Sequence, residues 1–289
     1  MYKNSKIILF AFGSLDLKKS ADRLKNQAIN SKYYDEIRIL NPKNFDNQMK
    51  LKFDELRKNK KIRGFGYWFW KPLFLQKILS EVNTNDIIHY VDIGCHIQNR
   101  NNKFYQYLDF LISKDLWILA FQYHLENLIY DKEINFEKRE EFKYSKGDLF
   151  SHFNCEKNID ITNTPQYWAG SFFLRKQKKT QIFLQEWIEI FEKKFELIDD
   201  SPSRIKNFEG FIENRHDQSV FSILCKKNNI KSFSAYECEW GIKNNLRCWD
   251  HNFDNPILAK RDLKYGIFKR FINRQIKTYR RFKKKINLI

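Results

Sequence analysis

The sequence predicts an α/β fold in which helices cover a parallel sheet. A short, continuously apolar run, Ile7–Phe12, ends at Gly13-Ser14, which is typical of a buried strand that runs into a loop. Residues 17–30 then carry apolar side chains at helical spacing, and residues 36–40 alternate as a second strand. A strand, a helix and a strand in this order favour a parallel sheet with helices packed on it.

The later elements continue this alternation. Buried strands are predicted over 87–91, 116–121 and 167–175, and helices over 74–82, 180–195 and 217–227. Beyond Pro256, apolar residues fall at helical spacing among many lysines and arginines. This pattern predicts a basic amphipathic helix, which is typical of a segment that lies on an anionic membrane surface.

The net charge of +18 indicates an anionic partner, which could be nucleic acid, an acidic membrane face or a phosphorylated substrate. Residues 260–289 contain twelve Lys and Arg against the single acid Asp262, so they account for +11 of this charge. The remaining body carries only +7. The basicity therefore belongs mainly to the terminal segment and says little about an active site.

Composition and missing motifs exclude several classes of protein. The five cysteines are widely spaced and include no CxxC pair, so we expect neither a disulfide framework nor a zinc site. No apolar run is long enough to span a bilayer, and we expect a cytoplasmic or peripheral protein. The sequence contains no Walker loop, GxGxxG fingerprint, GxSxG elbow or HExxH helix. The missing motifs therefore exclude the common classes of NTPase, dehydrogenase, hydrolase and zinc protease.

The first candidate site residue is a carboxylate at the end of a strand. Asp92 directly follows the predicted strand 87–91, and ligands of open α/β sheets bind at the carboxyl ends of the strands. Gly94 lets a ligand approach the backbone closely. A carboxylate at this place could hold a divalent cation that bridges a diphosphate. The alternative is an aspartate that only caps a loop.

The segment 63–72, RGFGYWFWKP, places five aromatic residues between two cations. Arg63 and Lys71 could neutralise a phosphate, while ring faces could stack on a base or a sugar. The alternative is that the rings belong to the core, with Pro72 in the first turn of a helix, and that the cations pair with structural carboxylates.

Two further segments carry polar groups beside apolar ones. In the predicted strand 167–175, Gly170 and Ser171 could leave room and a hydroxyl beside a ligand, although a tight strand–helix contact would use the same residues. At 215–219, Asp217 could be a base or could orient an acceptor hydroxyl, and His216 could be a base or a metal ligand. The alternative is that Asp217 only caps its helix.

Three of these segments, 63–72, Tyr90-Val-Asp-Ile-Gly-Cys95 and His216-Asp-Gln-Ser219, occur in the order seen in a known family. Between about residues 5 and 255 the chain resembles bacterial GT-A-type glycosyltransferases encoded in capsule, O-antigen and lipooligosaccharide clusters. The resemblance implies a Rossmann-like mixed sheet with flanking helices. It also implies transfer of a sugar from a nucleotide-diphosphate-sugar donor to a growing cell-surface glycan.

The same resemblance implies a division of the chain and a set of site residues. Residues 1–255 would form the glycosyltransferase domain, with a donor-binding half at about 1–125 and an acceptor half at about 126–255, followed by the basic tail 256–289. Its implied residues are Gly13, Arg63, Lys71, Tyr90, Asp92, Gly94, Gly170 and Ser171 for the donor, His216, Asp217 and Gln218 for catalysis, and Asp92 and His216 for a metal.

This chain departs from the family pattern at one position. Asp92 matches the first acid of the Asp-x-Asp motif, but Gly94 stands where the second acid belongs. A Mn²⁺ or Mg²⁺ ion could be completed by His216 or by oxygens of the ligand, or Arg63 and Lys71 could supply the positive charge instead. Asp217 would be the general base of an inverting reaction or a positioning group in a retaining one.

Two other functions remain as alternatives. The charge and the interleaved rings and cations could belong to a nucleic-acid-binding protein, although the body without its tail is only modestly basic. The missing second acid also allows a non-catalytic scaffold of glycan assembly. For the transferase, the expected partners are a nucleotide sugar, a glycan or lipid-linked acceptor and, through 260–289, the inner face of the cytoplasmic membrane, without specific nucleic acid.

Overall fold

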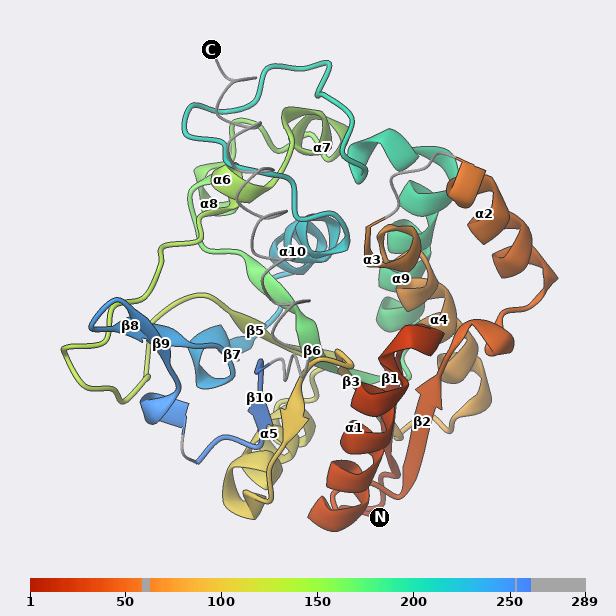
Figure 1. Ribbon diagram of the computed structural model, residues 1–289, viewed down its shortest axis with the longest axis vertical. Coiled ribbons are helices and arrows are strands. Elements are labelled where there is room, and N and C mark those ends of the chain that lie inside the picture. Colours follow the sequence, from red (N-terminus) through yellow and green to blue (C-terminus); the bar gives the residue numbers. More distant parts are fainter. Residues whose placement is uncertain (59–62, 253, 261–289) are drawn as a thin grey trace, which may run out of the picture.

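The computed structural model describes residues 1–58, 63–252 and 254–260. They form a six-stranded sheet with helices on both faces (Figure 1). The strand order across the sheet is β2-β1-β3-β6-β5-β7. In chain order these strands are β1 (Ile7–Phe12), β2 (Glu36–Leu40), β3 (Ile87–Val91), β5 (Ile118–Gln122), β6 (Tyr167–Arg175) and β7 (Ser232–Ser234).

The sheet is mixed, which confirms the α/β class and the mixed sheet that the family resemblance implies, whereas the first strands alone favoured a parallel one. β1 pairs in parallel with β2 and β3, and β5 pairs in parallel with β7. β6 runs antiparallel to both of its neighbours, β3 and β5. All nine residues of β6 are buried, and a strand that is apolar on both faces has the same composition in either direction. Its direction was therefore not encoded in its own residues.

Each face of the sheet has its own core. Odd-numbered residues of β1 pack into a core with α1 and α5, and its even-numbered residues pack into a second core with α4, α9 and α10. This division follows from the two-residue period of a strand. The five helices are α1 (Lys18–Ser31), α4 (Trp70–Glu81), α5 (Asn101–Ser113), α9 (Lys178–Lys193) and α10 (Asp217–Lys227).

Further helices, turns and short strands surround the central sheet and these five helices. The other helices are α2 (Asn47–Lys58), which has 12 residues, and the short α3 (Gly64–Tyr67), α6 (Glu141–Tyr144), α7 (Gly147–His152) and α8 (Ile159–Thr162). The 3₁₀ turns are Leu15–Leu17, Pro42–Asn44, Phe195–Leu197, Ala235–Glu237 and Asp250–Asn252. β8 (Gly241–Lys243) and β9 (Leu246–Cys248) form a hairpin. β10 (Ile257–Leu258) pairs with β4 (His96–Ile97), so the last described residues return to the segment that follows β3.

The sequence located most of these elements closely. The predicted strands 7–12, 36–40, 87–91 and 167–175 and the predicted helix 217–227 have the observed bounds. α4 begins at Trp70, four residues before the predicted start, because Pro72 lies inside its first turn, where its missing N–H costs no helical bond. The predicted basic amphipathic helix lies outside the described residues. Within the described ranges, no helix is both long and apolar enough to cross a membrane.

Candidate active site

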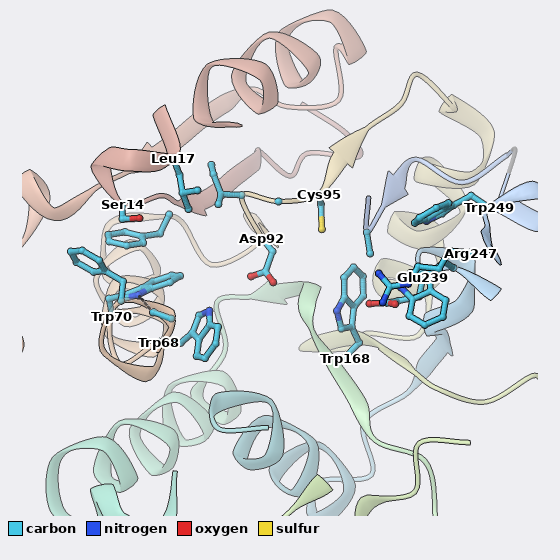
Figure 2. A pocket seen from close by; sticks show the side chains of 17 residues that line it. Ser14, Leu17, Trp68, Trp70, Asp92, Cys95, Trp168, Glu239, Arg247 and Trp249 are labelled. Atoms are coloured by element: carbon cyan, nitrogen blue, oxygen red, sulfur yellow. Dashed lines mark hydrogen bonds between the residues drawn. The ribbon is translucent and has the colours of Figure 1, made fainter. Parts of the chain in front are cut away.

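A cavity of about 640 Å³ opens where β1 and β3 end (Figure 2). The chain leaves β1 for β2 on one side and returns to β3 on the other, so the crevice between β1 and β3 is a topological switch point. One wall includes Phe12, Ser14, Trp68, Trp70, Asp92 and Gly94. The opposite wall includes Trp168, Glu239, Trp240, Arg247 and Trp249.

Asp92 faces this cavity from the turn that follows β3. Its backbone N–H donates to the carbonyl of Gly170 (2.8 Å), and its own carbonyl accepts from the N–H of Cys95 (2.8 Å). Its Oδ1 accepts from the hydroxyl of Tyr90 (2.5 Å), and its side chain is about one-third exposed. Burial, followed by the nearby charge of Asp92, raises the pKa of Tyr90 well above its ordinary value, so this hydroxyl remains a donor.

Lys71 lies directly behind Asp92 and is only 1% exposed. Its ammonium group donates to Oδ2 of Asp217 (2.5 Å) and to the carbonyl of Ala169 (3.1 Å). It also lies 3.8 Å from Oδ1 of Asp92 and 4.7 Å from the centre of the Tyr90 ring. A buried ammonium requires such partners. The predicted donor cation Lys71 is therefore held in the interior and does not line the cavity.

Asp217 begins α10 and is buried against Lys71. Burial raises the pKa of its carboxyl to about 6, while the Lys71 ammonium acts in the opposite direction. Gln218 donates from Nε2 to Oε1 of Gln166 (3.0 Å). Neither predicted catalytic side chain lines the cavity. The structure thus brings Asp217 close to Asp92 through Lys71, but it does not expose Asp217 to a ligand.

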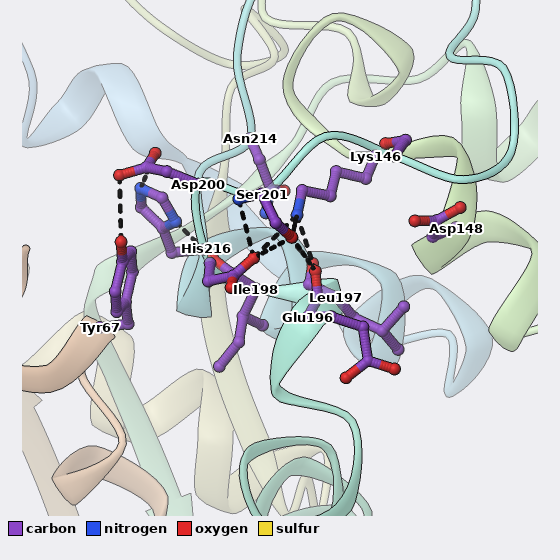
Figure 3. Close-up of polar contacts among 12 residues, drawn as sticks. Tyr67, Lys146, Asp148, Glu196, Leu197, Ile198, Asp200, Ser201, Asn214 and His216 are labelled. Carbon is purple, nitrogen blue, oxygen red and sulfur yellow. Dashed lines mark hydrogen bonds and ion pairs between the residues drawn. The ribbon is translucent and has the colours of Figure 1, made fainter. Parts of the chain in front are cut away.

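His216 contacts the loop 196–201 and does not line the cavity (Figure 3). Its Nδ1 donates to the carbonyl of Ile198 (2.5 Å), and its Nε2 lies 3.8 Å from Asp200. Lys146 donates to the carbonyl of Glu196 (2.7 Å), and Asn214 donates to the carbonyl of Leu197 (3.1 Å), which anchors the loop. Burial lowers the pKa of His216, so its ring is neutral at neutral pH.

The segment 64–68 explains why two glycines stand in the motif. Gly64, Phe65, Gly66, Tyr67 and Trp68 all have positive φ, between 53° and 89°. Residues with a side chain adopt this left-handed conformation at a cost of about 1–2 kcal/mol each. A methyl group at Gly64 would lie 2.4 Å from the Trp68 ring. The turn places the Phe65 and Trp68 rings in the cavity wall.

The other predicted site residues surround the cavity without forming its lining. Arg63 is exposed and pairs with Asp200 (3.3 Å). The hydroxyl of Ser171 is fully buried and lies 2.9 Å from Nε2 of His89. Gly13 donates its N–H to the carbonyl of Leu40 (3.0 Å).

Gly170 has a local role that the sequence did not reveal. A methyl group on this glycine would lie 2.4 Å from the Trp168 ring, so Gly170 makes room for that indole. The space beside Gly170 is therefore filled by the chain itself. The indole in turn forms part of the cavity wall.

The wall on the far side of Asp92 was missed by sequence reasoning. It comes from Trp168 and from the C-terminal residues Glu239, Trp240, Arg247 and Trp249 (Figure 2). A short stretch with two tryptophans and an arginine is a compositional signal for a ligand wall. Tertiary contacts bring this stretch to the switch point, among them the pairing of β4 with β10 and the bridge between Asn135 and Ile242.

The residues present do not fit a divalent cation held by protein ligands. Across the described part of the chain, no group of three or more His, Cys, Asp and Glu side chains is arranged to hold a metal. Asp92 supplies one carboxylate and Gly94 supplies none, while Glu239, the other carboxylate of the lining, lies on the opposite wall and pairs with Arg139 (3.5 Å). His216, the other predicted ligand, lies outside the cavity lining. Asp92 is also already compensated by Lys71 and Tyr90.

No protein-family model matches the chain, and no curated protein matches it. Among solved structures it is similar to mouse xyloside xylosyltransferase 1 in its apo form, with 9% identity over 81% of this chain and 86% of that one and a TM-score of 0.41. A glycosyltransferase involved in glycosylation of the major capsid of PBCV-1 has 7% identity over 90% of this chain and 96% of that one, with a TM-score of 0.44.

A third similar structure is the galactosyltransferase LgtC in complex with donor and acceptor sugar analogs. It has 10% identity over 81% of this chain and 75% of that one, with a TM-score of 0.40. The three proteins are glycosyltransferases by description. At identities and TM-scores this low, the likeness carries no argument about what this chain does, which depends on its own site.

Proposed function

We propose that the chain is a GT-A-type glycosyltransferase that moves a sugar from a nucleoside-diphosphate sugar to a hydroxyl group of a growing cell-surface glycan, in capsule, O-antigen or lipooligosaccharide synthesis. The observation that carries this proposal is the cavity at the switch point, with Asp92 between a ring-lined wall and a tryptophan–arginine wall. Its volume of about 640 Å³ lies in the range of small-molecule sites.

The donor's nucleoside would occupy the wall beside β1. The partly exposed ring of Trp68 is available there to a base, and the hydroxyl of Ser14, which donates to Asp16 (2.5 Å), can accept a hydrogen bond from a ribose. The sugar and the diphosphate would then lie near Asp92 and the turn at Gly94, where the strand ends and a ligand can approach the backbone. The donor-binding role of Gly94 and Asp92 is kept in this proposal.

In the transfer, the bond from the anomeric carbon to the phosphate oxygen breaks, and its electron pair leaves with the nucleoside diphosphate. The acceptor oxygen bonds to the anomeric carbon and loses its proton. Asp92 and Glu239 are the carboxylates of the lining, so we assign proton acceptance to one of them. Asp217 becomes a positioning residue, since it holds Lys71 against Asp92 and Ala169.

The membrane partner in this proposal depends on the sequence alone. The basic stretch 260–289 would place the enzyme on the inner face of the cytoplasmic membrane, where lipid-linked acceptors occur. Residues 261–289 lie outside the described part of the chain. Deletion of 261–289 should abolish binding to vesicles that contain anionic lipid and leave nucleotide binding intact.

The decisive experiment is thermal stabilisation of the chain by a panel of UDP-, GDP-, CMP- and dTDP-sugars, with and without manganese. One nucleotide series should raise the melting temperature, and Trp68→Ala should reduce that rise. Ile182→Ala, which removes an exposed apolar residue of α9, is the control that should not reduce it. If no nucleotide sugar stabilises the protein, the scaffold alternative replaces the enzyme.

A further inference from the structure

We propose that the cavity binds the diphosphate of its ligand through Arg247, a cation on the C-terminal hairpin, instead of through a metal ion or through Arg63 and Lys71. The ligand class, a nucleoside diphosphate, depends on the proposed function. The cation that meets it is a separate inference, because it follows from which positive charges the cavity presents.

The two cations that the sequence suggested are occupied elsewhere. Lys71 is 1% exposed, and its ammonium is bound to Asp217 and to the carbonyl of Ala169. Arg63 pairs with Asp200 and does not line the cavity. A diphosphate carries at least two negative charges and requires a cation that can reach it.

Arg247 is the only lysine or arginine in the cavity lining formed by the described residues. It lies on β9, is exposed, and its guanidinium lies 4.0 Å from the centre of the Trp240 ring. In the ranges 1–58, 63–252 and 254–260 it makes no ion pair with a carboxylate. Stacking fixes the plane of a guanidinium and leaves its N–H edge for a phosphate, which it can bind in a bidentate manner.

The charges around Arg247 favour an anion. Glu239 is the acidic neighbour on this wall, but its Oε2 lies 3.5 Å from the guanidinium of Arg139. Lys260 adds a second cation nearby, 5.7 Å from the centre of the Trp249 ring. With Glu239 paired to Arg139, the uncompensated charge of this wall's lining is that of Arg247, so the wall presents positive charge to the cavity.

The fold keeps this wall in place opposite Asp92. β10 pairs with β4, which follows the turn at Asp92, and the N–H of Ala259 donates to the carbonyl of Cys238 (2.8 Å). These contacts tie the C-terminal segment to the switch point on both sides of the hairpin. Arg247 and Asp92 consequently line one cavity (Figure 2).

Lys243 provides a matched control on the same hairpin. It lies on β8, and its ammonium pairs with Asp131 (2.7 Å) and Glu133 (2.8 Å) outside the cavity lining. Lys243→Ala removes a cation from the hairpin without touching the cavity. If positive charge on the hairpin mattered only in general, both variants would bind the diphosphate more weakly. If Arg247 contacts the phosphate, only Arg247→Ala would bind it more weakly.

The test is calorimetric titration of the full chain in the presence of EDTA with UDP, GDP, CDP and dTDP, and with the matching nucleosides. For the nucleotide that binds, Arg247→Ala should lower the affinity for the nucleoside diphosphate by roughly ten- to a hundredfold, which is the range expected for the loss of a hydrogen bond to a charged group. It should leave nucleoside binding unchanged. Arg247→Lys should recover part of the loss, because lysine keeps the charge without the fork, and Lys243→Ala should bind like the unaltered chain.

Three results would overturn the inference. If Arg247→Ala binds the diphosphate as tightly as the unaltered chain, Arg247 is not the cation, while the proposed function stands. If the variant binds the diphosphate normally but has a raised acceptor KM in turnover, Arg247 contacts the acceptor instead. If the unaltered chain binds none of the nucleotides, the proposed function and the inference fall together. Far-ultraviolet circular dichroism of each variant separates these results from misfolding.

Discussion

The ammonium group of Lys71 lies 2.5 Å from the carboxylate of Asp217, although 146 residues separate them in the chain. Both residues are almost fully buried. The pair joins the first turn of α4 to the first turn of α10, and the same ammonium binds the carbonyl of Ala169 in β6. This contact stabilises the floor of the cavity below Asp92.

Breaking this pair from one side should destabilise the protein strongly. Lys71→Met leaves Asp217 buried without a partner, and Asp217→Leu leaves a buried ammonium, so each should lower the free energy of unfolding by about 3–5 kcal/mol. The double variant should recover most of the loss, because no uncompensated charge remains. Urea denaturation at pH 7 measures all three.

The control for this cycle is Lys193→Met, which removes an exposed partner of Glu189 (3.6 Å) in α9. Exposed pairs contribute at most about 1 kcal/mol. If the double variant lost as much free energy of unfolding as the two single variants together, the Lys71–Asp217 pair would not be the source of the effect.

Donor binding should not depend on a divalent metal. The described residues near Asp92 do not form a ligand set, and Gly94 replaces the expected second acid. We therefore expect the nucleotide affinity in EDTA to match that in manganese within about twofold, as measured by calorimetry. An increase of a hundredfold or more with manganese would contradict the geometry of the site.

Asp92 should be needed for turnover more than for binding. Asp92→Asn keeps the size of the side chain and removes the lining carboxylate, so we expect kcat to fall by about a hundredfold or more. Nucleotide affinity should not fall and should rise by at most a few-fold, since the variant removes a negative charge that faces a diphosphate. Asp22→Asn, an exposed change on α1, should behave like the unaltered chain. Equal turnover in both variants would exclude Asp92 from the chemistry.

Gly64 should be required by both the fold and the cavity wall. Gly64→Ala introduces a methyl group 2.4 Å from the Trp68 ring at a φ of +53°, so the ring must move. We expect a loss of about 1–3 kcal/mol in stability together with weaker nucleotide binding. Quenching of tryptophan fluorescence by the nucleotide measures the binding.

Gly210→Ala is the matched control for the backbone conformation. Gly210 has a φ of +82°, but among the described residues its added methyl group would meet only Phe142 at 3.4 Å, away from the cavity. This variant should lose about 1 kcal/mol of stability and bind the nucleotide normally. Equal losses of affinity in the two variants would mean that Trp68 is not part of the site.

Acid should destabilise the protein through His89. Burial lowers the pKa of His89 to about 3, and its ring nitrogens lie 2.9 Å from the hydroxyls of Tyr34 and Ser171. The unfolded chain takes up this proton below a pH of about 6.5, whereas the folded protein does so only near 3. Stability is therefore lost as the pH falls through this window, by about 2 kcal/mol between pH 7 and pH 5.

His89→Gln isolates that contribution, because glutamine stays neutral throughout. The raised pKa of Asp217 acts in the opposite direction, since the folded protein keeps that proton up to a pH of about 6, but it is common to both proteins and cancels in their difference. Urea denaturation at pH 7 and pH 5 should show the extra loss only in the unaltered chain. Parallel pH profiles would rule out His89.

The sequence predicted the central elements well and the site only in part. Ile7–Phe12 and Tyr167–Arg175 were located because apolar runs bounded by polar or turn residues indicate buried strands. The sequence placed Asp92 at the end of a strand, where the structure has the cavity, because a strand end is a local feature. Arg63 and Lys71 were chosen for their charge, but charge alone does not reveal whether a cation faces a cavity or an interior carboxylate.

By itself the sequence determined the α/β class, the positions of most strands and helices, and the glycines that permit the left-handed turn at 64–68, because these depend on residues close together in the chain. The tertiary structure decided the antiparallel direction of β6, the burial of Lys71 against Asp217, and the position of Arg247 opposite Asp92. These depend on contacts between segments about 45 to 155 residues apart in the chain. At such separations pairing and burial act together, and no local pattern specifies the partner.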